Sequence, residues 1–85
     1  MDFVVPRGRD AVDAIECKWK SEAFETRGLG AFREQYSQGK NYVVSPLSGP
    51  AYERVQAGLK IAFVSPGELR QAVASKPFPR ERATR

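Results

Sequence analysis

Hydrophobic and polar positions along the chain form short stretches that predict strands more often than helices. Residues 2–5 are rich in β-forming side chains, residues 6–10 have the composition of a turn, and residues 12–19 alternate between apolar and polar. Together they predict an antiparallel hairpin. Two further strands are expected at 40–44 and 60–64, and the unbroken apolar run of the second indicates burial on both faces of a sheet.

Two other segments carry helix signals. Residues 21–38 predict a loop that passes into a helix, whose apolar stripe and terminal glycine are Leu29, Phe32, Tyr36 and Gly39. Ser65 and Glu68 match a capping box at the start of a second helix. Between the last two strands, residues 47–58 are expected to form a loop with a helical turn around Tyr52–Gln56.

The predicted elements follow the order β-β-α-β-β-α, which indicates a mixed α/β fold with a mixed sheet. The chain has 85 residues, enough for one small hydrophobic core. We therefore expect a single α/β domain over residues 1–75 and a disordered basic tail over residues 76–85. The tail has four basic residues and one acidic residue, so it carries +3 of the net charge of +4.

Composition excludes several classes of protein. One cysteine and no histidine rule out a disulfide framework and the usual zinc sites. The sequence shows no signal peptide and no apolar run near the ~18 residues of a membrane span, so we expect no membrane partner. A reducing, cytoplasmic location is the default expectation for such a chain.

Asp2, Glu16 and Lys18 are the residues that could carry chemistry. Residues two apart on a strand share a face, so Glu16 and Lys18 project to the same side. The opposite side, which we expect to contribute to or cap the core, carries Ile15, Cys17 and Trp19.

The length of the hairpin loop decides where Asp2 lies. If residues 8–10 form the loop, Arg7 faces Ala11, and Asp2 then faces Glu16 on the same side of the hairpin. A loop that is one residue longer or shorter places the two carboxylates on opposite faces. Two carboxylates that face each other repel, and Mg²⁺, which prefers carboxylate oxygens, would compensate.

Lys18 beside such a pair could orient a water or stabilise negative charge on a phosphate. The alternative is that Glu16 and Lys18 form a weak ion pair on an exposed strand face, which is common in hairpins.

The residues Asp2 to Val5 and Ala14 to Lys18 resemble the PD-(D/E)xK nuclease-like superfamily, in which a strand-borne Asp precedes Glu-x-Lys on the next strand. More narrowly, the chain resembles the nuclease-like C-terminal domain of a largely uncharacterised family of prokaryotic AAA-type ATPases. The later segments that fit this family are Leu29 to Phe32, Tyr42 to Ser45, and Ile61 to Val64 with the helix after Ser65.

The resemblance implies a truncated restriction-endonuclease-like core. It implies that Asp2 and Glu16 bind Mg²⁺, that Lys18 is the catalytic lysine, and that the reaction is hydrolysis of a DNA phosphodiester. The chain starts at the Asp strand and has no Walker loop, so no ATP site is expected in it. We expect a C-terminal piece of a larger protein that is separated from its ATPase module.

Other functions remain open. Arg7, Arg9 and Lys20 could form a basic rim that binds nucleic acid, or they could be solvated charges on a hairpin. The same fold could be a non-catalytic module for docking or oligomerisation, with self-association through an exposed sheet edge or the truncated face. Sequence-tolerant DNA binding through the basic tail is a third possibility.

Overall fold

The computed structural model describes residues 2–46 and 50–74 of the chain. Its strands are β1 (Phe3–Pro6), β2 (Val12–Cys17), β3 (Asn41–Val44), β4 (Tyr52–Gln56) and β5 (Leu59–Val64). Its helices are the short 3-10 turn η1 (Ser21–Ala23) and the α-helices α1 (Arg27–Gln35) and α2 (Pro66–Ala74). The predicted basic tail over residues 76–85 lies outside the described residues.

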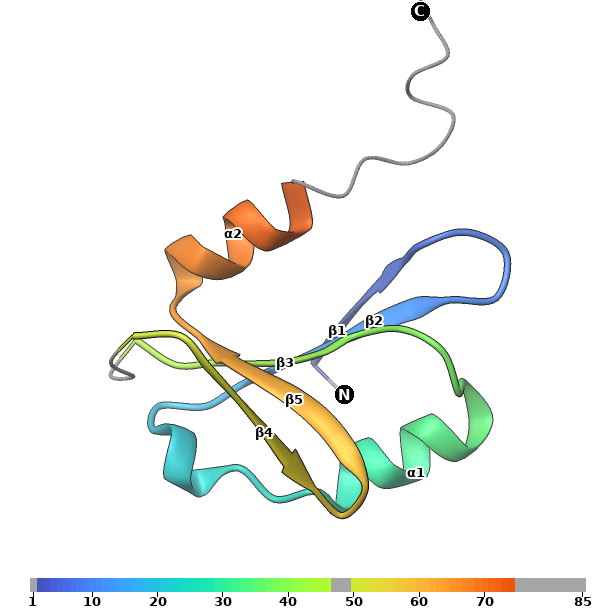
Figure 1. The fold of residues 1–85 in the computed structure, drawn as a ribbon, viewed down its shortest axis with the longest axis horizontal. Coiled ribbons are helices and arrows are strands. Elements are labelled where there is room, and N and C mark those ends of the chain that lie inside the picture. Colours follow the sequence, from blue (N-terminus) through green and yellow to red (C-terminus); the bar gives the residue numbers. More distant parts are fainter. Residues whose placement is uncertain (1, 47–49, 75–85) are drawn as a thin grey trace, which may run out of the picture.

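The strands form one mixed sheet with two α-helices on it. The five-stranded sheet has the order β1-β2-β3-β5-β4. Strands β2, β3 and β5 are parallel, and the edge strands β1 and β4 run antiparallel to their neighbours. Figure 1 shows α1 and α2 on opposite sides of this sheet. The predicted mixed α/β class is confirmed, and β5 is an interior strand as its apolar run indicated.

Alternation along the strands divides the core into two layers. The layer on the α1 side contains Ala14, Phe24, Leu29, Val43, Ile61 and Phe63. The layer on the α2 side contains Ile15, Tyr42, Val44 and Val64, with Leu69 and Ala72 of α2 packed against it. Adjacent residues of β2 and β3 therefore contribute to different layers, as the pleat of a strand requires.

The expected helical turn at Tyr52–Gln56 is wrong, because this segment is strand β4. It pairs with β5 from Tyr52↔Phe63 to Gln56↔Leu59, so only Ala57 and Gly58 lie between the strands. Both have positive φ, 52° and 77°, which is the backbone of a type I′ hairpin turn. Alanine is uncommon in that conformation, and its presence concealed the turn signal in the sequence.

The expected core positions of Cys17 and Trp19 are also wrong. Cys17 is exposed, and Trp19 is 70% exposed. Strand β2 ends at Cys17, so the alternation that places Ile15 in the core does not extend to the tryptophan. The Trp19 carbonyl accepts a 2.7 Å hydrogen bond from the buried Ser45 hydroxyl.

Helix α1 buries a different stripe from the expected one. Leu29 and Arg33 are buried and Phe32 is partly buried, whereas Tyr36 is exposed and packs on the Phe32 ring. Gly39 is not the residue after the helix end, since α1 ends at Gln35. Its φ of 132° and its close approach to the Val12 carbonyl explain the glycine instead.

The capping box at the start of α2 is confirmed. The Ser65 amide donates to Glu68 Oε1 at 2.9 Å, and the Glu68 amide donates to Ser65 Oγ at 3.2 Å. Hydrogen bonding to the carboxylate, first from the Ser65 amide and then from the Ser65 side chain, holds the pKa of the Glu68 carboxyl below its ordinary value. Neither described α-helix has the length and apolar character that a membrane crossing needs.

Candidate functional site

Asp2, Glu16 and Lys18 lie at one end of the sheet, where the parallel strands finish. Asp2 precedes β1. Glu16 and Cys17 are the last two residues of β2, and Lys18 follows the strand. Because β1 is antiparallel to β2, its start lies beside the carboxyl end of β2. Ligand sites in open α/β sheets form outside the carboxyl ends of the parallel strands.

The register of the hairpin is the one in which residues 8–10 form the loop. Phe3 pairs with Ile15 and Val4 with Ala14, and the Arg7 amide donates to the Ala11 carbonyl at 2.7 Å. Continued by one residue, this register sets Asp2 opposite Glu16. Ala14 lies in the core layer on the α1 side. Glu16 is two residues along the same strand, so its side chain, and that of Asp2 opposite it, project to the α1 side of the sheet.

The Asp2 carboxylate has a contact of its own. Asp2 Oδ2 accepts a 2.8 Å hydrogen bond from the Cys17 amide. The even-numbered amides of β2 bond to the β3 side, as Ala14 does to Lys40 and Lys18 to Val44. The odd-numbered Cys17 amide therefore faces β1, and the Asp2 side chain satisfies it at the point where the ladder ends.

Glu16 and Lys18 form an ion pair beside a surface hollow. Lys18 Nζ lies 3.8 Å from Glu16 Oε2, and both side chains are partly exposed. The hollow is lined by Glu16, Lys18, Ala23, Glu25, Arg27 and Gly28. Two cationic side chains and two carboxylates therefore surround one depression on the α1 side.

The amino end of α1 adds backbone donors to this hollow. Helix α1 starts at Arg27, and Thr26 before it makes no side-chain capping bond. The first intrahelical bond comes from the Gly30 amide to the Thr26 carbonyl at 2.8 Å. The amides of residues 27–29 consequently have no partner within the helix, and the helix dipole favours an anion near them.

The titration of Cys17 reflects the same charge distribution. Cys17 is exposed, but neighbouring groups shield its thiol partly from water, and this desolvation first, then the negative charges of Asp2 and Glu16, raise the thiol pKa above its ordinary value. Both carboxylates are therefore close enough to Cys17 to act on it electrostatically. The raised pKa argues against a thiolate nucleophile at this position.

The donor chemistry of the site suits a hard divalent cation. Asp2 and Glu16 offer carboxylate oxygens, which Mg²⁺ prefers to imidazole or thiolate ligands. In the part of the chain that the structure describes, no three His, Cys, Asp or Glu side chains group as metal ligands. Mg²⁺ held by two carboxylates keeps several water ligands, which is its ordinary mode of binding.

The expected basic rim is not brought together. Arg7 and Arg9 lie at the loop end of the hairpin, and Lys20 lies beyond the other end of β2. The six residues of β2 separate these ends by roughly 20 Å at ~3.3 Å per residue. Arg9 and Lys20 are exposed, whereas Arg7 binds Asp13 Oδ2 at 3.0 Å and the Val73 carbonyl at 3.2 Å.

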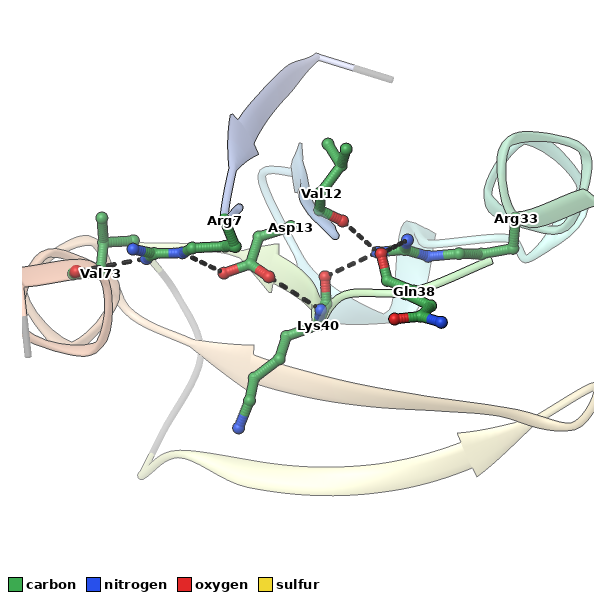
Figure 2. Close-up of polar contacts among 7 residues, drawn as sticks. All are labelled: Arg7, Val12, Asp13, Arg33, Gln38, Lys40 and Val73. Carbon is green, nitrogen blue, oxygen red and sulfur yellow. Dashed lines mark hydrogen bonds and ion pairs between the residues drawn. The ribbon is translucent and has the colours of Figure 1, made fainter. Parts of the chain in front are cut away.

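A polar network that the sequence did not indicate lies at the opposite, amino end of the parallel strands. Buried Arg33 donates to the Asn41 side chain and to four carbonyls, each within 2.9 Å, those of Tyr36, Gln38, Val12 and Lys40. Asp13 accepts from Arg7 and from the Lys40 amide at 2.9 Å. Figure 2 shows these contacts running from α2 through Arg7, Asp13 and Lys40 to α1.

This network has a structural role. Asp13 is 2% exposed and its contacts are protein groups, so it cannot meet a substrate. An arginine on the buried stripe of a helix is a signal that could have been noticed, since Arg33 lies four residues after Leu29. Its five acceptors lie on Val12 of β2 and on residues 36–41, and the tertiary fold brings these two stretches around one guanidinium.

A second hollow lies on the α2 side and around the amino ends of β3 and β5. Tyr42, Ala62, Val64 and Ala72 give it an apolar floor, with Lys40, Glu53 and Lys60 among its charged residues. The pKa of the Tyr42 hydroxyl is raised, first by burial and then by the negative charge of Asp13. Glu53 pairs with Lys60 at 3.8 Å, and Lys40 and Arg33 leave the lining of this hollow net positive.

Comparison of the chain with protein-family models, curated proteins and solved structures finds no match.

Proposed function

We propose that this chain is a nuclease-like domain of the PD-(D/E)xK type, with a truncated restriction-endonuclease-like core, from an AAA-type ATPase. Its reaction is the Mg²⁺-dependent hydrolysis of DNA phosphodiester bonds. The observation that carries the proposal is the hairpin register, which sets Asp2 opposite Glu16 and leaves Lys18 on the same face. The resemblance in sequence supplies the reaction class.

The roles of the residues follow from their chemistry. Asp2 and Glu16 would hold the cation with carboxylate oxygens. Bound Mg²⁺ would lower the pKa of water and offset the charge of a phosphate. Lys18 is two residues along from Glu16, so its ammonium can stabilise the charge that develops on a phosphate oxygen near those carboxylates.

The rest of the hollow supports phosphate binding. Arg27 supplies a guanidinium, and the amides at the start of α1 supply donors that point out of the helix. Arg27 and Lys18 would bind the DNA backbone without regard to sequence, as phosphate contacts do. Glu25 beside them would repel phosphate, and a cation would reduce that repulsion.

The competing explanation is purely structural. The Asp2 carboxylate satisfies the Cys17 amide, and Glu16 pairs with Lys18, so the residues have contacts without any ligand. A non-catalytic docking module would use the same contacts. The two explanations differ in whether the carboxylates bind a divalent cation together.

Calorimetric titration of Mg²⁺ and Mn²⁺ into the chain tests the proposal. We expect saturable binding to the parent chain and its loss in Asp2→Asn and in Glu16→Gln, since each variant removes one charged ligand. Asp10→Asn, which neutralises an exposed acid at the loop end of the hairpin, is the matched control and should bind as the parent does. Lys18→Met should retain metal binding, and in a DNA nicking assay it should lower the rate about 100-fold or more.

Two results would contradict the proposal. A folded parent chain that binds no divalent cation would assign Asp2 and Glu16 to the structural role. Binding that survives both substitutions, or that Asp10→Asn removes equally, would place the cation elsewhere. Circular dichroism of each variant separates loss of binding from loss of fold.

A further inference from the structure

The two edges of the sheet differ in character. Edge strand β4 exposes the charged residues Glu53 and Arg54, and charge on an edge discourages pairing with another strand. Edge strand β1 has no charged residue between Phe3 and Pro6. Phe3 is 59% exposed and Val4 is 48% exposed, so β1 presents apolar side chains to solvent on both faces of the sheet.

The backbone of β1 directs hydrogen-bonding groups away from β2 at defined positions. The Arg7 amide donates to the Ala11 carbonyl, so these two residues occupy a hydrogen-bonded position of the hairpin. Hydrogen-bonded pairs alternate along an antiparallel ladder, and the Val4–Ala14 pair is therefore a non-bonded one. The bond from the Ala14 amide to Lys40 on the β3 side agrees with this. The amide and carbonyl of Val4 thus point away from β2.

We propose that β1 pairs with β1 of a second copy of this chain, antiparallel and with Val4 opposite Val4. Each Val4 amide then donates to the other Val4 carbonyl, and each Asp2 amide donates to the Pro6 carbonyl of the second copy. Pro6 has no amide hydrogen, so it ends the ladder after these four hydrogen bonds. The two sheets join into one continuous sheet across a two-fold axis. This inference does not depend on the proposed function.

The side chains agree with this register. Phe3 lies opposite Val5 of the second copy on the α2 side, where Val5 already packs against the core layer of Ile15 and Tyr42. The two Val4 side chains meet on the α1 side. No pair of like charges faces across the seam, because Asp2 lies opposite Pro6. Main-chain bonds give such strand addition its affinity, and alternate side chains give it specificity.

Sedimentation velocity over a range of chain concentrations tests the association. We expect a monomer–dimer equilibrium for the parent chain, because an interface of two short strands is small and its complex weak. Val4→Lys places two ammonium groups opposite each other and should shift the midpoint to at least 10-fold higher concentration. Val55→Lys is the matched control, since Val55 is 71% exposed on the other edge strand, and it should leave the midpoint unchanged.

Disulfide trapping tests the register, in a Cys17→Ser background so that the introduced thiol is the one that reacts. Opposed residues of a hydrogen-bonded pair have Cα atoms about 5.5 Å apart, which suits a disulfide. Val4→Cys should therefore form a covalent dimer under mild oxidation. Phe3→Cys should not, because the two copies of residue 3 would be separated by about 8 Å, two residues along the strand and one strand spacing across.

The outcomes that overturn the proposal are distinct. A parent chain that stays monomeric at high concentration would show that β1 does not pair with β1 of a second copy. If Val55→Lys weakens the association and Val4→Lys does not, the interface between the copies lies at edge strand β4 instead of β1. Faster trapping at residue 3 than at residue 4 would contradict the register. Circular dichroism of Val4→Lys shows whether the monomer keeps its fold.

Discussion

The Cys17 thiol reports on the position of both candidate carboxylates. Asp2 accepts the hydrogen bond of the Cys17 amide, and Glu16 precedes Cys17 in β2. Partial desolvation and these two negative charges raise the pKa of the thiol. A raised pKa lowers the thiolate fraction near pH 8, and the thiolate is the form that alkylating reagents attack.

Alkylation of Cys17 by iodoacetamide should therefore be slower at pH 8 than alkylation of an unperturbed cysteine. The pH at half-maximal rate should lie above the ordinary thiol pKa. Asp2→Asn removes one negative charge while keeping an oxygen that can accept from the Cys17 amide, so it should lower that midpoint and raise the rate. Asp10→Asn, at the far end of the hairpin, should change neither.

A rate that does not respond to Asp2→Asn would contradict the placement of Asp2 beside Cys17. The measurement is a rate against pH on the folded chain and needs no metal and no DNA. It therefore tests the geometry of the candidate site separately from its proposed activity.

Single residues were predictable where a local rule acts. The face of Glu16 follows from strand alternation, whereas the residue opposite it depends on the length of the turn, which the sequence left open and the register decides. The exposure of Trp19 does not follow from alternation, because β2 ends two residues earlier. The spacing of Arg33 from Leu29 indicates its burial, but its hydrogen-bond partners were not predictable, because only the tertiary fold brings Val12 and residues 36–41 around one guanidinium.

Among the connections between elements, the link from α1 to β3 is the most tightly constrained. An added Cβ at Gly39 would overlap the Val12 carbonyl oxygen, and the Gly39 φ is 132°. Gly39 therefore allows this link to pass directly against β2, where the Val12 amide donates to the Gln38 carbonyl. Gly30 inside α1 differs, because an added Cβ there would meet nothing within 4 Å.

The same substitution should have opposite effects at these two glycines. Gly30→Ala should stabilise the chain by up to about 1 kcal/mol, because alanine has the higher helix propensity and restricts the unfolded chain. Gly39→Ala should destabilise it by about 2 kcal/mol or more, because the backbone of β2 must move and the positive φ is strained. Urea unfolding of the two variants and the parent measures both changes.

A neutral Gly39→Ala would show that the link does not pass against Val12. A destabilising Gly30→Ala would show that α1 packs more closely at that position than the structure indicates.

Elements were predictable where their signals are strong in the sequence. The capping box located the start of α2 because its two reciprocal hydrogen bonds require a fixed residue spacing. Strand β4 was missed because its turn carries Ala57 at a position where asparagine or glycine is the usual signal. The number of strands therefore could not be obtained from local patterns, although the mixed α/β class could.

The whole molecule separates its structural polar groups from its candidate site. At the amino end of the parallel strands, Arg33 attaches α1 to the sheet, and Arg7 with Asp13 attaches α2. Figure 2 shows the two halves meeting at the Lys40 peptide, whose amide donates to Asp13 and whose carbonyl accepts from Arg33. At the carboxyl end, Asp2, Glu16 and Lys18 are partly or fully exposed. Substitutions at the two ends should consequently affect different properties.

Coupling between Arg7 and Asp13 tests the amino-end network. Arg7→Met removes the guanidinium from a carboxylate whose side chain is 2% exposed, and we expect a loss of about 3 kcal/mol, the cost of a buried carboxylate without its partner. Asp13→Asn should cost less, about 1–2 kcal/mol, because an asparagine oxygen can still accept from the Lys40 amide. The double variant should be more stable than the sum of the two losses predicts, by at least about 1 kcal/mol.

Urea unfolding of the parent, the two single variants and the double variant measures the coupling in stability. Mg²⁺ titration of the same four chains measures whether the substitutions change cation affinity. Additive losses would mean that Arg7 and Asp13 stabilise the fold independently, and that the contact does not join α2 to the sheet. A change in cation affinity in a folded Asp13→Asn chain would mean that the two ends of the sheet are coupled. We expect neither, because β2 separates the ends by roughly 20 Å and the contacts of Asp13 lie at the amino end.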